Sequence, residues 1–186
     1  MSAYKIHQVE RDQQIYEILT LQSLNHKTSL SSKEIIDEGF VTCKHDFSLL
    51  KKMNHPCPHI IATFKGEVVG YCLVMSDDHR DELEVLQSMF KMIERQSIDG
   101  QLIESKDYIA MGQVCIDKQH RRKGLFKKMY DHFWEQLSPH YKYCITEVAT
   151  SNVRSLQAHE AVGFKNLLSY KANDGRDWEL IVWDWS

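Results

Sequence analysis

The chain has 186 residues, of which 42% are hydrophobic and 26% charged, and its formal net charge is −3. This length and composition are typical of one globular domain with a sizeable core, and the net charge argues against nucleic acid or an anionic membrane as the main partner. No apolar stretch approaches the roughly 20 residues that cross a bilayer, and the start of the chain lacks an apolar signal core. The five scattered cysteines do not suggest a disulfide framework, so we expect a cytoplasmic protein.

The N-terminal part is predicted to alternate short strands and helices. Apolar spacing predicts a strand, a helix, two shorter helices and a hairpin, at 4–7, 11–26, about 31–36, 47–53 and 59–75. Ser31 or Ser32 is a candidate N-cap of the second helix. The hairpin is the clearest of these elements, because two apolar runs flank a short polar turn at Gly66.

The C-terminal part contains a helical insertion and then alternating strands and helices. Apolar positions at helical spacing predict a helix over 77–96, within an insertion of about 77–100 that ends at the turn Asp99-Gly100. Four strands at 107–117, 143–149, about 165–171 and 177–185 and two helices at 123–137 and about 152–162 follow. A turn at Asn173-Asp174-Gly175 joins the last two strands.

These elements predict an α/β fold with a mixed sheet. The strand, helix and strand from 107 to 149 require a right-handed crossover and a parallel pair, whereas the hairpins are antiparallel. We therefore expect a single domain over 1–186, with a central sheet of about six to seven strands flanked by helices.

The segment from Tyr108 to Lys128 runs from a strand through a basic turn into a helix. A helix N-terminus offers N–H groups and a partial positive charge, which together bind phosphate well. Gly124 lets a ligand approach the backbone closely. Positive side chains surround this point, namely Arg121, Arg122, Lys123, Lys127 and Lys128. A basic cluster at a helix start is usually only a solvated surface, so this pattern by itself does not identify a phosphate site.

A second motif, N-V-R-S-L-Q-A-H-E-A-V-G-F, runs from Asn152 to Phe164. With both segments present, the chain resembles the GNAT acetyltransferase superfamily over roughly residues 60–185. The positions of the family's Q/R-x-x-G-x-G/A loop and of its second motif correspond to Arg121, Gly124, Phe126, Asn152, Ser155, His159, Gly163 and Phe164. Phe126 departs from the family, which usually has Gly or Ala there. Its place on the apolar helix stripe favours the core for this ring, although the sequence also allows it to narrow the pyrophosphate site.

The resemblance implies acetyl-CoA as co-substrate. The family's loop holds the pyrophosphate, which here implies contacts from Arg121, Arg122, Lys123, Gly124, Leu125, Phe126 and Lys127. Asn152 would hold the pantetheine arm, and this arm would pair with the backbone of Val114, Cys115 and Ile116. In the family the fourth and fifth strands, here 107–117 and 143–149, are parallel and splay apart, and the acetyl group lies in the opening.

The catalytic groups are less well defined than the cofactor groups. An alkylammonium has a pKa near 10.4, so a transferase has to remove a proton from its acceptor. The strand from 108 to 116 has no carboxylate where some relatives carry Glu, so Glu147 is the candidate base; alternatively it is a buried partner of a basic residue. His159 stands where many relatives have Tyr and is the candidate donor to the CoA thiolate, with local packing as the alternative. Cys115 is expected to be a buried small residue, because family members transfer the acetyl group directly.

The resemblance thus implies an N-acetyltransferase, an acyltransferase acting on a primary amine of a small molecule or a protein by direct attack in a ternary complex. The missing strand carboxylate and His159 leave a second interpretation open, a catalytically silent acyl-CoA-binding sensor or partner module. Nucleic-acid binding through the basic cluster at 118–128 is disfavoured by the acidic net charge.

The sequence gives little indication of a metal ion, of a partner macromolecule or of the particular acceptor. His55, Cys57 and His59 have metal-ligand chemistry but no second ligand pair at zinc-site spacing, so no metal is expected. No membrane partner is expected either. A homodimer stays open, because the terminal strand with Trp183 and Trp185 could pair with another copy. The acceptor amine is not identified, although the acidic residues of the insertion could attract a cationic amine.

Overall fold

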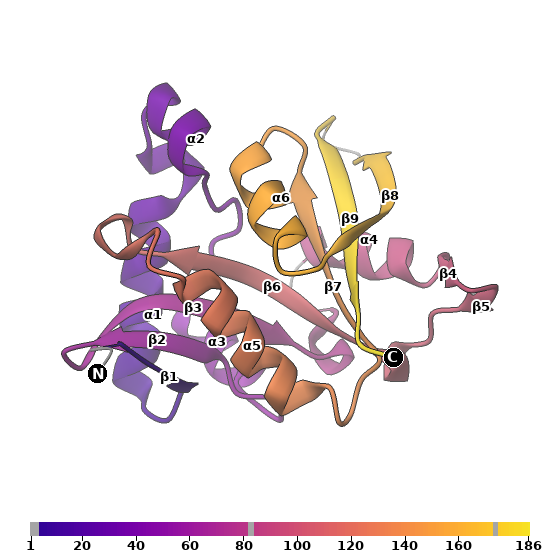
Figure 1. The fold of residues 1–186 in the computed structure, drawn as a ribbon, viewed down its shortest axis with the longest axis horizontal. Helices are drawn as coiled ribbons and strands as arrows, with labels where there is room; N and C mark the ends of the chain where they lie inside the picture. The colour runs from indigo at the N-terminus through magenta and orange to yellow at the C-terminus, as the bar shows by residue number, and fades with distance from the viewer. Residues whose placement is uncertain (1–3, 82–83, 173–174) are drawn as a thin grey trace. The chain divides into compact units, whose positions relative to one another are not determined.

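The computed structural model describes residues 4–81, 84–172 and 175–186. Its main strands are Tyr4–Gln8 (β1), Ile60–Phe64 (β2), Glu67–Met75 (β3), Tyr108–Ile116 (β6), Tyr143–Ala149 (β7), Lys165–Lys171 (β8) and Asp177–Asp184 (β9). Its helices are Asp12–Asn25 (α1), Ser32–Glu38 (α2), Phe47–Met53 (α3), Glu84–Ile93 (α4), Leu125–Leu137 (α5) and Val153–Glu160 (α6). The strands form one mixed sheet in the order β1-β2-β3-β6-β7-β9-β8 (Figure 1). The predicted α/β fold with a mixed sheet is confirmed.

The residues gather into two compact units. The first contains 1–74 and 112–136, and the second contains 75–111 and 137–186. The strand β6 contributes residues to both units. One domain over 1–186 stays a prediction.

In the first unit, β1, β2 and β3 form an antiparallel meander, of which the β2–β3 hairpin was predicted. Ile60 lies opposite Cys72, and the two-residue turn Lys65-Gly66 has positive φ at both positions, 53° and 92°. Positive φ at both residues matches the twist of a tight hairpin, and glycine adopts it without steric cost.

The helix α5 packs closely on β3 at Gly70. A Cβ atom at Gly70 would lie 3.3 Å from Met129 Sδ, and also 3.3 Å from Cys115 O and Ile116 Cγ1. Leu125, Met129 and Phe133 of α5 are buried, which confirms the predicted apolar stripe. Successive side chains of a strand point to opposite faces, so Tyr71 lies on the face of β3 away from α5.

In the second unit, β6 and β7 form the predicted parallel pair. Their ladder joins Tyr108 to Tyr143, Ile109 to Cys144 and Ala110 to Ile145, and no further pair is formed between them within this unit's described residues. Next to the end of this ladder, the hydroxyl of Thr146 donates to Met111 O at 2.7 Å. The ladder between β6 and β7 in this unit therefore consists of three residue pairs, and splaying of the two strands stays a prediction.

Three predictions about the later elements need correction or comment. The continuous helix over 77–96 was wrong: a 3₁₀ helix at Asp77–His79 and α4 are followed by a small hairpin of Ser97–Ile98 (β4) and Gln101–Leu102 (β5). The predicted turn Asp99-Gly100 is present, and its positive φ angles of 50° and 79° close this hairpin. Asn173 and Asp174 of the predicted last turn lie outside the described residues.

Pairing of the terminal strand with another copy was also a wrong expectation. Both edges of β9 are occupied, by β7 on one side and β8 on the other. A strand with two hydrogen-bonded neighbours has no backbone groups left for a third.

Candidate cofactor-binding and catalytic residues

The turn between β6 and α5 has a backbone suited to binding an anion. A 3₁₀ helix at Lys118–His120 follows β6, and Arg122 and Gly124 then adopt left-handed conformations with φ of 59° and 74°. Lys128 N donates to Gly124 O at 3.1 Å and begins the hydrogen-bond ladder of α5. Left-handed residues next to a helix start turn successive N–H groups toward one concave point, where an oxyanion can be bound.

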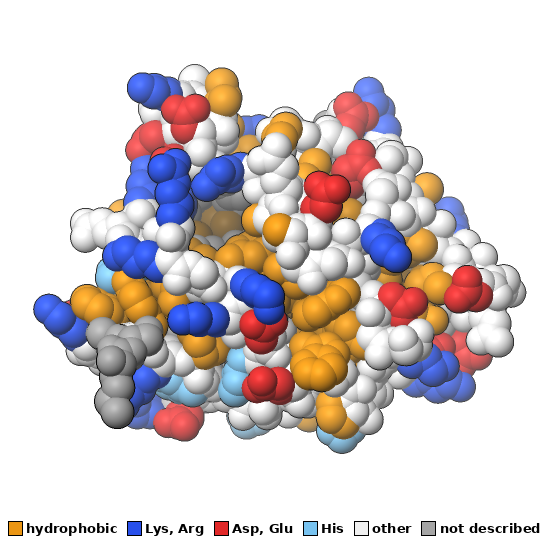
Figure 2. Space-filling view, in the orientation of Figure 1, with side chains coloured by type: hydrophobic (Ala, Val, Ile, Leu, Met, Phe, Trp, Pro, Cys, Tyr) orange, Lys and Arg blue, Asp and Glu red, His pale blue; other side chains and the backbone are white. Residues whose placement is uncertain are grey.

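The space next to Gly124 is open. A Cβ atom built there would meet no described atom within 4 Å. Arg122, Lys123 and Lys127 are exposed, and Figure 2 shows Lys and Arg side chains gathered over this turn and the start of α5. Lys127 pairs with Asp131 at 2.6 Å, and Lys123 Nζ donates to Gln119 O at 2.9 Å. Both bonds are exposed, so these side chains can turn to a bound phosphate at little cost.

Phe126 is turned along the side of α5. Its ring is half-buried and lies 5.1 Å, between ring centroids, from Tyr130 one helical turn later. The position next to Gly124 is therefore left open by this ring.

The side chain of Arg121 attaches the turn to α1 and α2. The sequence did not predict this connection. The Nε of Arg121 donates to Ile116 O at 2.9 Å, one terminal nitrogen to Glu38 Oε2 at 2.7 Å and Glu38 O at 3.0 Å, and the other to Asn25 Oδ1 at 2.7 Å. The side chain is only 17% exposed. Because the guanidinium is occupied by protein groups, the predicted cofactor contact of Arg121 is available through its backbone, and it stays a prediction.

A second ion pair joins the same two segments. Lys118 donates to Glu34 of α2, whose side chain also forms a capping box with Ser31, the helix N-cap. The hydrogen bond from Lys118 lowers the pKa of Glu34 to about 2. The turn after β6 is thus attached to both ends of α2.

The predicted cofactor-binding residues of β6 alternate between two environments. Cys115 is buried, whereas Val114 and Ile116 are half-buried. Burial raises the pKa of the Cys115 thiol to about 12, so the thiol is protonated at neutral pH. This agrees with the expectation that Cys115 is a buried small residue. Pairing of this strand with the pantetheine arm stays a prediction.

Asn152 and His159 are positioned by α6. Asn152 is the buried N-cap of this helix, and its Oδ1 accepts from Ser155 N at 3.4 Å. His159 is 1% exposed, and its Nδ1 lies 2.7 Å from Ser155 O. A carbonyl oxygen only accepts, so Nδ1 carries the proton. Burial lowers the pKa of His159 to about 4, so the ring is neutral at pH 7. The cofactor and catalytic roles of these two residues stay predictions.

Glu147 has a partner from β8, which is separated from β7 by β9 in the sheet. It is half-buried on β7, and its Oε2 accepts a hydrogen bond from the hydroxyl of Tyr170 on β8. The sequence suggested a basic partner as the alternative to catalysis, and the hydrogen bond found is to a phenol. No sequence signal links these residues, because their proximity depends on the register of β7, β9 and β8. The role of Glu147 as base stays a prediction.

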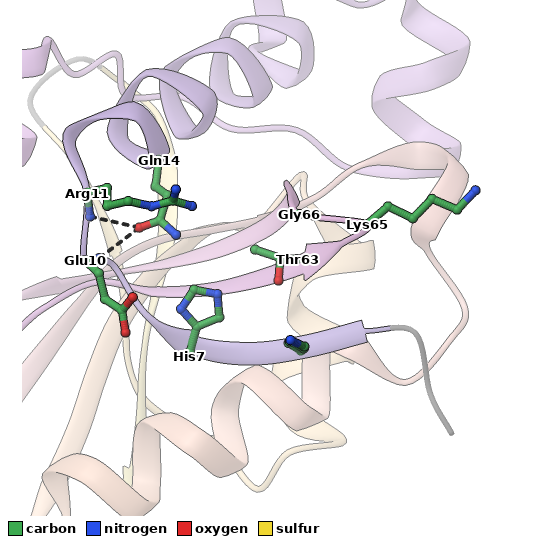
Figure 3. Close-up of a pocket in the computed structure, with 8 residues that line it drawn as sticks. His7, Glu10, Arg11, Gln14, Thr63, Lys65 and Gly66 are labelled. Carbon is green, nitrogen blue, oxygen red and sulfur yellow. Dashed lines mark hydrogen bonds between the residues drawn. The ribbon is translucent and has the colours of Figure 1, made fainter.

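Each unit has a hollow among its described residues. One of about 400 Å³ in the first unit is lined by Lys5, His7, Glu10, Arg11, Gln14, Thr63, Lys65 and Gly66 (Figure 3). Gln14 Oε1 accepts there from the N–H groups of Glu10 and Arg11 at 2.8 and 3.0 Å and so stabilises the start of α1. One of about 610 Å³ in the second unit is lined by Leu156, Glu160, Gly163, Phe164, Lys165, Asn166, Glu179 and Ile181.

Neither a candidate metal site nor a membrane-spanning helix is found among the described residues. No group of three or more His, Cys, Asp or Glu side chains lies close enough there to hold a metal ion. Within the same residues, every helix is too short or too polar to cross a bilayer.

Comparison with known proteins agrees with this fold. The model of the acetyltransferase (GNAT) family matches residues 13–164, and the chain therefore belongs to this family. Acetyl transfer from acetyl-CoA is the chemistry of the family. No curated protein sequence matches the chain significantly.

Solved structures with the same fold are distant in sequence. Ard1 from Thermoplasma volcanium is 14% identical with a TM-score of 0.67, over 97% of this chain and 96% of that one. The ribosomal-protein-S18-alanine N-acetyltransferase from Escherichia coli is 13% identical with a TM-score of 0.64, over 98% and 94%. YncA from Salmonella typhimurium, solved with its cofactor acetyl-CoA, is 13% identical with a TM-score of 0.64, over 100% and 95%.

Proposed function

We propose that the chain is an acetyl-CoA-dependent N-acetyltransferase that acts on a primary amine of a small molecule or a protein. The observation that carries the proposal is the turn before α5, where left-handed Arg122 and Gly124 precede an open helix start with positive side chains around it. This backbone suits the pyrophosphate of the coenzyme. Residues 121–127 would bind it, with Arg122, Lys123 and Lys127 reaching the phosphates.

The proposed reaction is a direct transfer in a ternary complex. The neutral amine attacks the thioester carbonyl, a C–N bond forms, the C–S bond breaks, and the proton of the nitrogen goes to a base. The CoA thiolate leaves and takes up a proton. A strand N–H near Ile116 would polarise the thioester oxygen, as in an oxyanion hole. Asn152 would hold the pantetheine arm.

Release of the CoA thiol from acetyl-CoA in the presence of a panel of amines tests the proposal, with acetyl-CoA affinity measured by calorimetry on the same protein. We expect amine-dependent thiol release. Tight binding with no release for any amine would instead support the acyl-CoA-binding sensor that the sequence left open. Absence of binding would contradict both functions.

His159→Ala tests the predicted proton donor. If His159 assists the departure of the thiolate, kcat should fall by about a hundredfold, a typical contribution of general acid catalysis, while the affinity for acetyl-CoA is kept. At pH 7 the ring is neutral with its proton on Nδ1, so it can donate to the thiolate only after taking up a second proton. Because burial lowers its pKa to about 4, the His159-dependent part of kcat should fall as pH rises from 6 to 9. His159→Tyr, with the residue many relatives carry, is the matched variant and should retain activity. Unchanged turnover of His159→Ala would remove the role.

Glu147→Gln tests the predicted base. A carboxylate that accepts the proton of the amine should produce an ascending limb in the profile of kcat/KM against pH, and this limb should disappear in Glu147→Gln. Tyr170→Phe removes the phenol bonded to Glu147 but keeps the carboxylate, and it should keep the limb. If the limb persists in Glu147→Gln, another group is the base.

A further inference from the structure

A buried polar network in the first unit connects α1, β3 and β6 with the segment between α2 and α3. Its side chains are Gln22, His45, Tyr71 and Gln113, exposed by 2%, 9%, 0% and 8%. Gln113 Oε1 accepts from Tyr71 OH at 2.6 Å and from Gln22 Nε2 at 2.8 Å. Gln22 Nε2 also lies 2.8 Å from His45 Nδ1. Buried polar groups are retained when their hydrogen bonds are satisfied, so an unpaired member of such a network is informative.

Backbone groups at both ends fix the direction of every hydrogen bond in this network. Gln113 Nε2 donates to the carbonyl of Cys43 at 3.1 Å, so the other atom of this amide is its oxygen. Gln22 Oε1 accepts from His45 N at 2.9 Å, so Gln22 Nε2 is a donor to both of its neighbours. His45 Nδ1 is therefore an acceptor, and the proton of the neutral ring is on Nε2.

His45 Nε2 is buried and has no hydrogen-bond partner among the described residues. Burial lowers the pKa of His45 to about 4, so the ring is neutral and Nε2–H is a donor at pH 7. A buried donor without an acceptor destabilises the folded state. Such a donor calls for an acceptor from outside the chain, which a water, an ion or a ligand can supply.

Two other buried histidines of the same unit show what a purely structural histidine looks like in this fold. His59 Nε2 lies 3.1 Å from Leu50 O, and its Nδ1 accepts from Val74 N at 3.1 Å. His26 Nε2 lies 2.9 Å from Thr42 O, and its Nδ1 lies 2.8 Å from Thr28 Oγ1. Both rings use both nitrogens, whereas His45 uses one.

The network is attached to the strand that the proposed function assigns to the thioester. Gln113 immediately precedes Val114, and its side chain lies on the buried face of β6 together with Cys115. Ile116 lies on the other face, against Gly70. His45 is therefore two hydrogen bonds from this strand, on the face away from α5 and its basic turn.

We propose that His45 is a specificity-determining residue whose Nε2–H binds a carbonyl oxygen of the acceptor substrate. A neutral donor offers nothing to a bare alkylammonium but pairs well with an amide or carboxylate oxygen. The preferred acceptor is then an amine with a carbonyl group next to the amino carbon, as in an amino acid or a peptide N-terminus. This inference rests on the proposed function and adds the acceptor class to it.

The test compares kcat/KM for alaninamide and isopropylamine, which differ by the carboxamide, in wild type, His45→Phe and His59→Phe. The preference for alaninamide should fall about tenfold in His45→Phe, the usual effect of one lost hydrogen bond. His59→Phe loses a buried histidine whose nitrogens both have protein partners, and its preference should be that of wild type. An unchanged preference in His45→Phe overturns the proposal. Alanine as a third acceptor distinguishes a free amino acid from a peptide-like amide.

A binding measurement on the wild-type protein tests the proposal even if His45→Phe does not fold. With histidine labelled by ¹⁵N, the Nε2–H signal of His45 should shift when alaninamide is added in the presence of CoA, and isopropylamine should leave it unchanged. No shift with alaninamide overturns the proposal for His45. If no amine supports thiol release, the proposed function fails, and the signal of His45 still decides whether the carbonyl site exists.

Discussion

Gly124→Asp is expected to weaken acetyl-CoA binding by about thirtyfold or more, because it places a carboxylate where the pyrophosphate would bind. Loss of hydrogen bonds between backbone N–H groups and a charged ligand costs about 2 kcal/mol, and like-charge repulsion adds to it. Asp tolerates left-handed φ better than most residues and is favourable at a helix start. The protein should therefore stay folded, and calorimetric titration with acetyl-CoA measures the loss directly.

Gly100→Asp is the matched control for this variant. Gly100 has φ of 79°, close to the 74° of Gly124, and neither glycine has a described atom within 4 Å of an added Cβ. The two substitutions thus introduce the same side chain with similar backbone strain, but Gly100 lies in the β4–β5 turn. Equal affinities of Gly124→Asp and Gly100→Asp for acetyl-CoA would show that the turn before α5 does not bind the coenzyme.

Arg121→Met is expected to destabilise the protein by about 2–4 kcal/mol, because it leaves partly buried acceptors on Ile116, Glu38 and Asn25 without their donor. For a protein of this size, that corresponds to a fall in Tm of about 5–15 °C. Thermal unfolding followed by circular dichroism measures the change. Since Arg121 holds the turn before α5 in place, the affinity for acetyl-CoA should fall as well.

Lys118→Met provides the comparison for Arg121→Met. Lys118 and Glu34 join the same segments as Arg121 and Glu38, but both of their side chains are 39% exposed, against 17% for Arg121. Exposed ion pairs contribute little to stability, so Lys118→Met should unfold close to the wild-type temperature. Equal effects of the two substitutions would mean that burial of the Arg121 bonds is not what stabilises this connection.

The fold could be predicted largely because its signals are local. Hydrophobic periodicity located the β2–β3 hairpin and α5, and the length of the crossover required a parallel pair of β6 and β7. The insertion was predicted less well, because the helix was extended back to residue 77, where the structure has a 3₁₀ helix at Asp77–His79 before α4. The small hairpin that follows α4 depends on the turn at Asp99-Gly100.

The candidate site could be predicted only where one segment carries it. Gly124 and its basic neighbours are adjacent in sequence, so one turn was enough to suggest a phosphate site. The bonds from Arg121 to Asn25 and Glu38 span 96 and 83 residues, and the bond from Gln22 to Gln113 spans 91. Such contacts follow from tertiary packing, and neither periodicity nor a motif indicates them in a single sequence.

The attachment of Arg121 to the end of α2 has a consequence for how this protein could diverge. Glu38 is the last residue of α2, and Gly39, with φ of 75°, starts the segment that leads to His45. One side chain thus supports both the turn proposed to bind the coenzyme and the base of that segment. If this turn binds the coenzyme and this segment the acceptor, as proposed, mutations that adapt the segment to a new acceptor would also weaken coenzyme binding, so the two traits should change together.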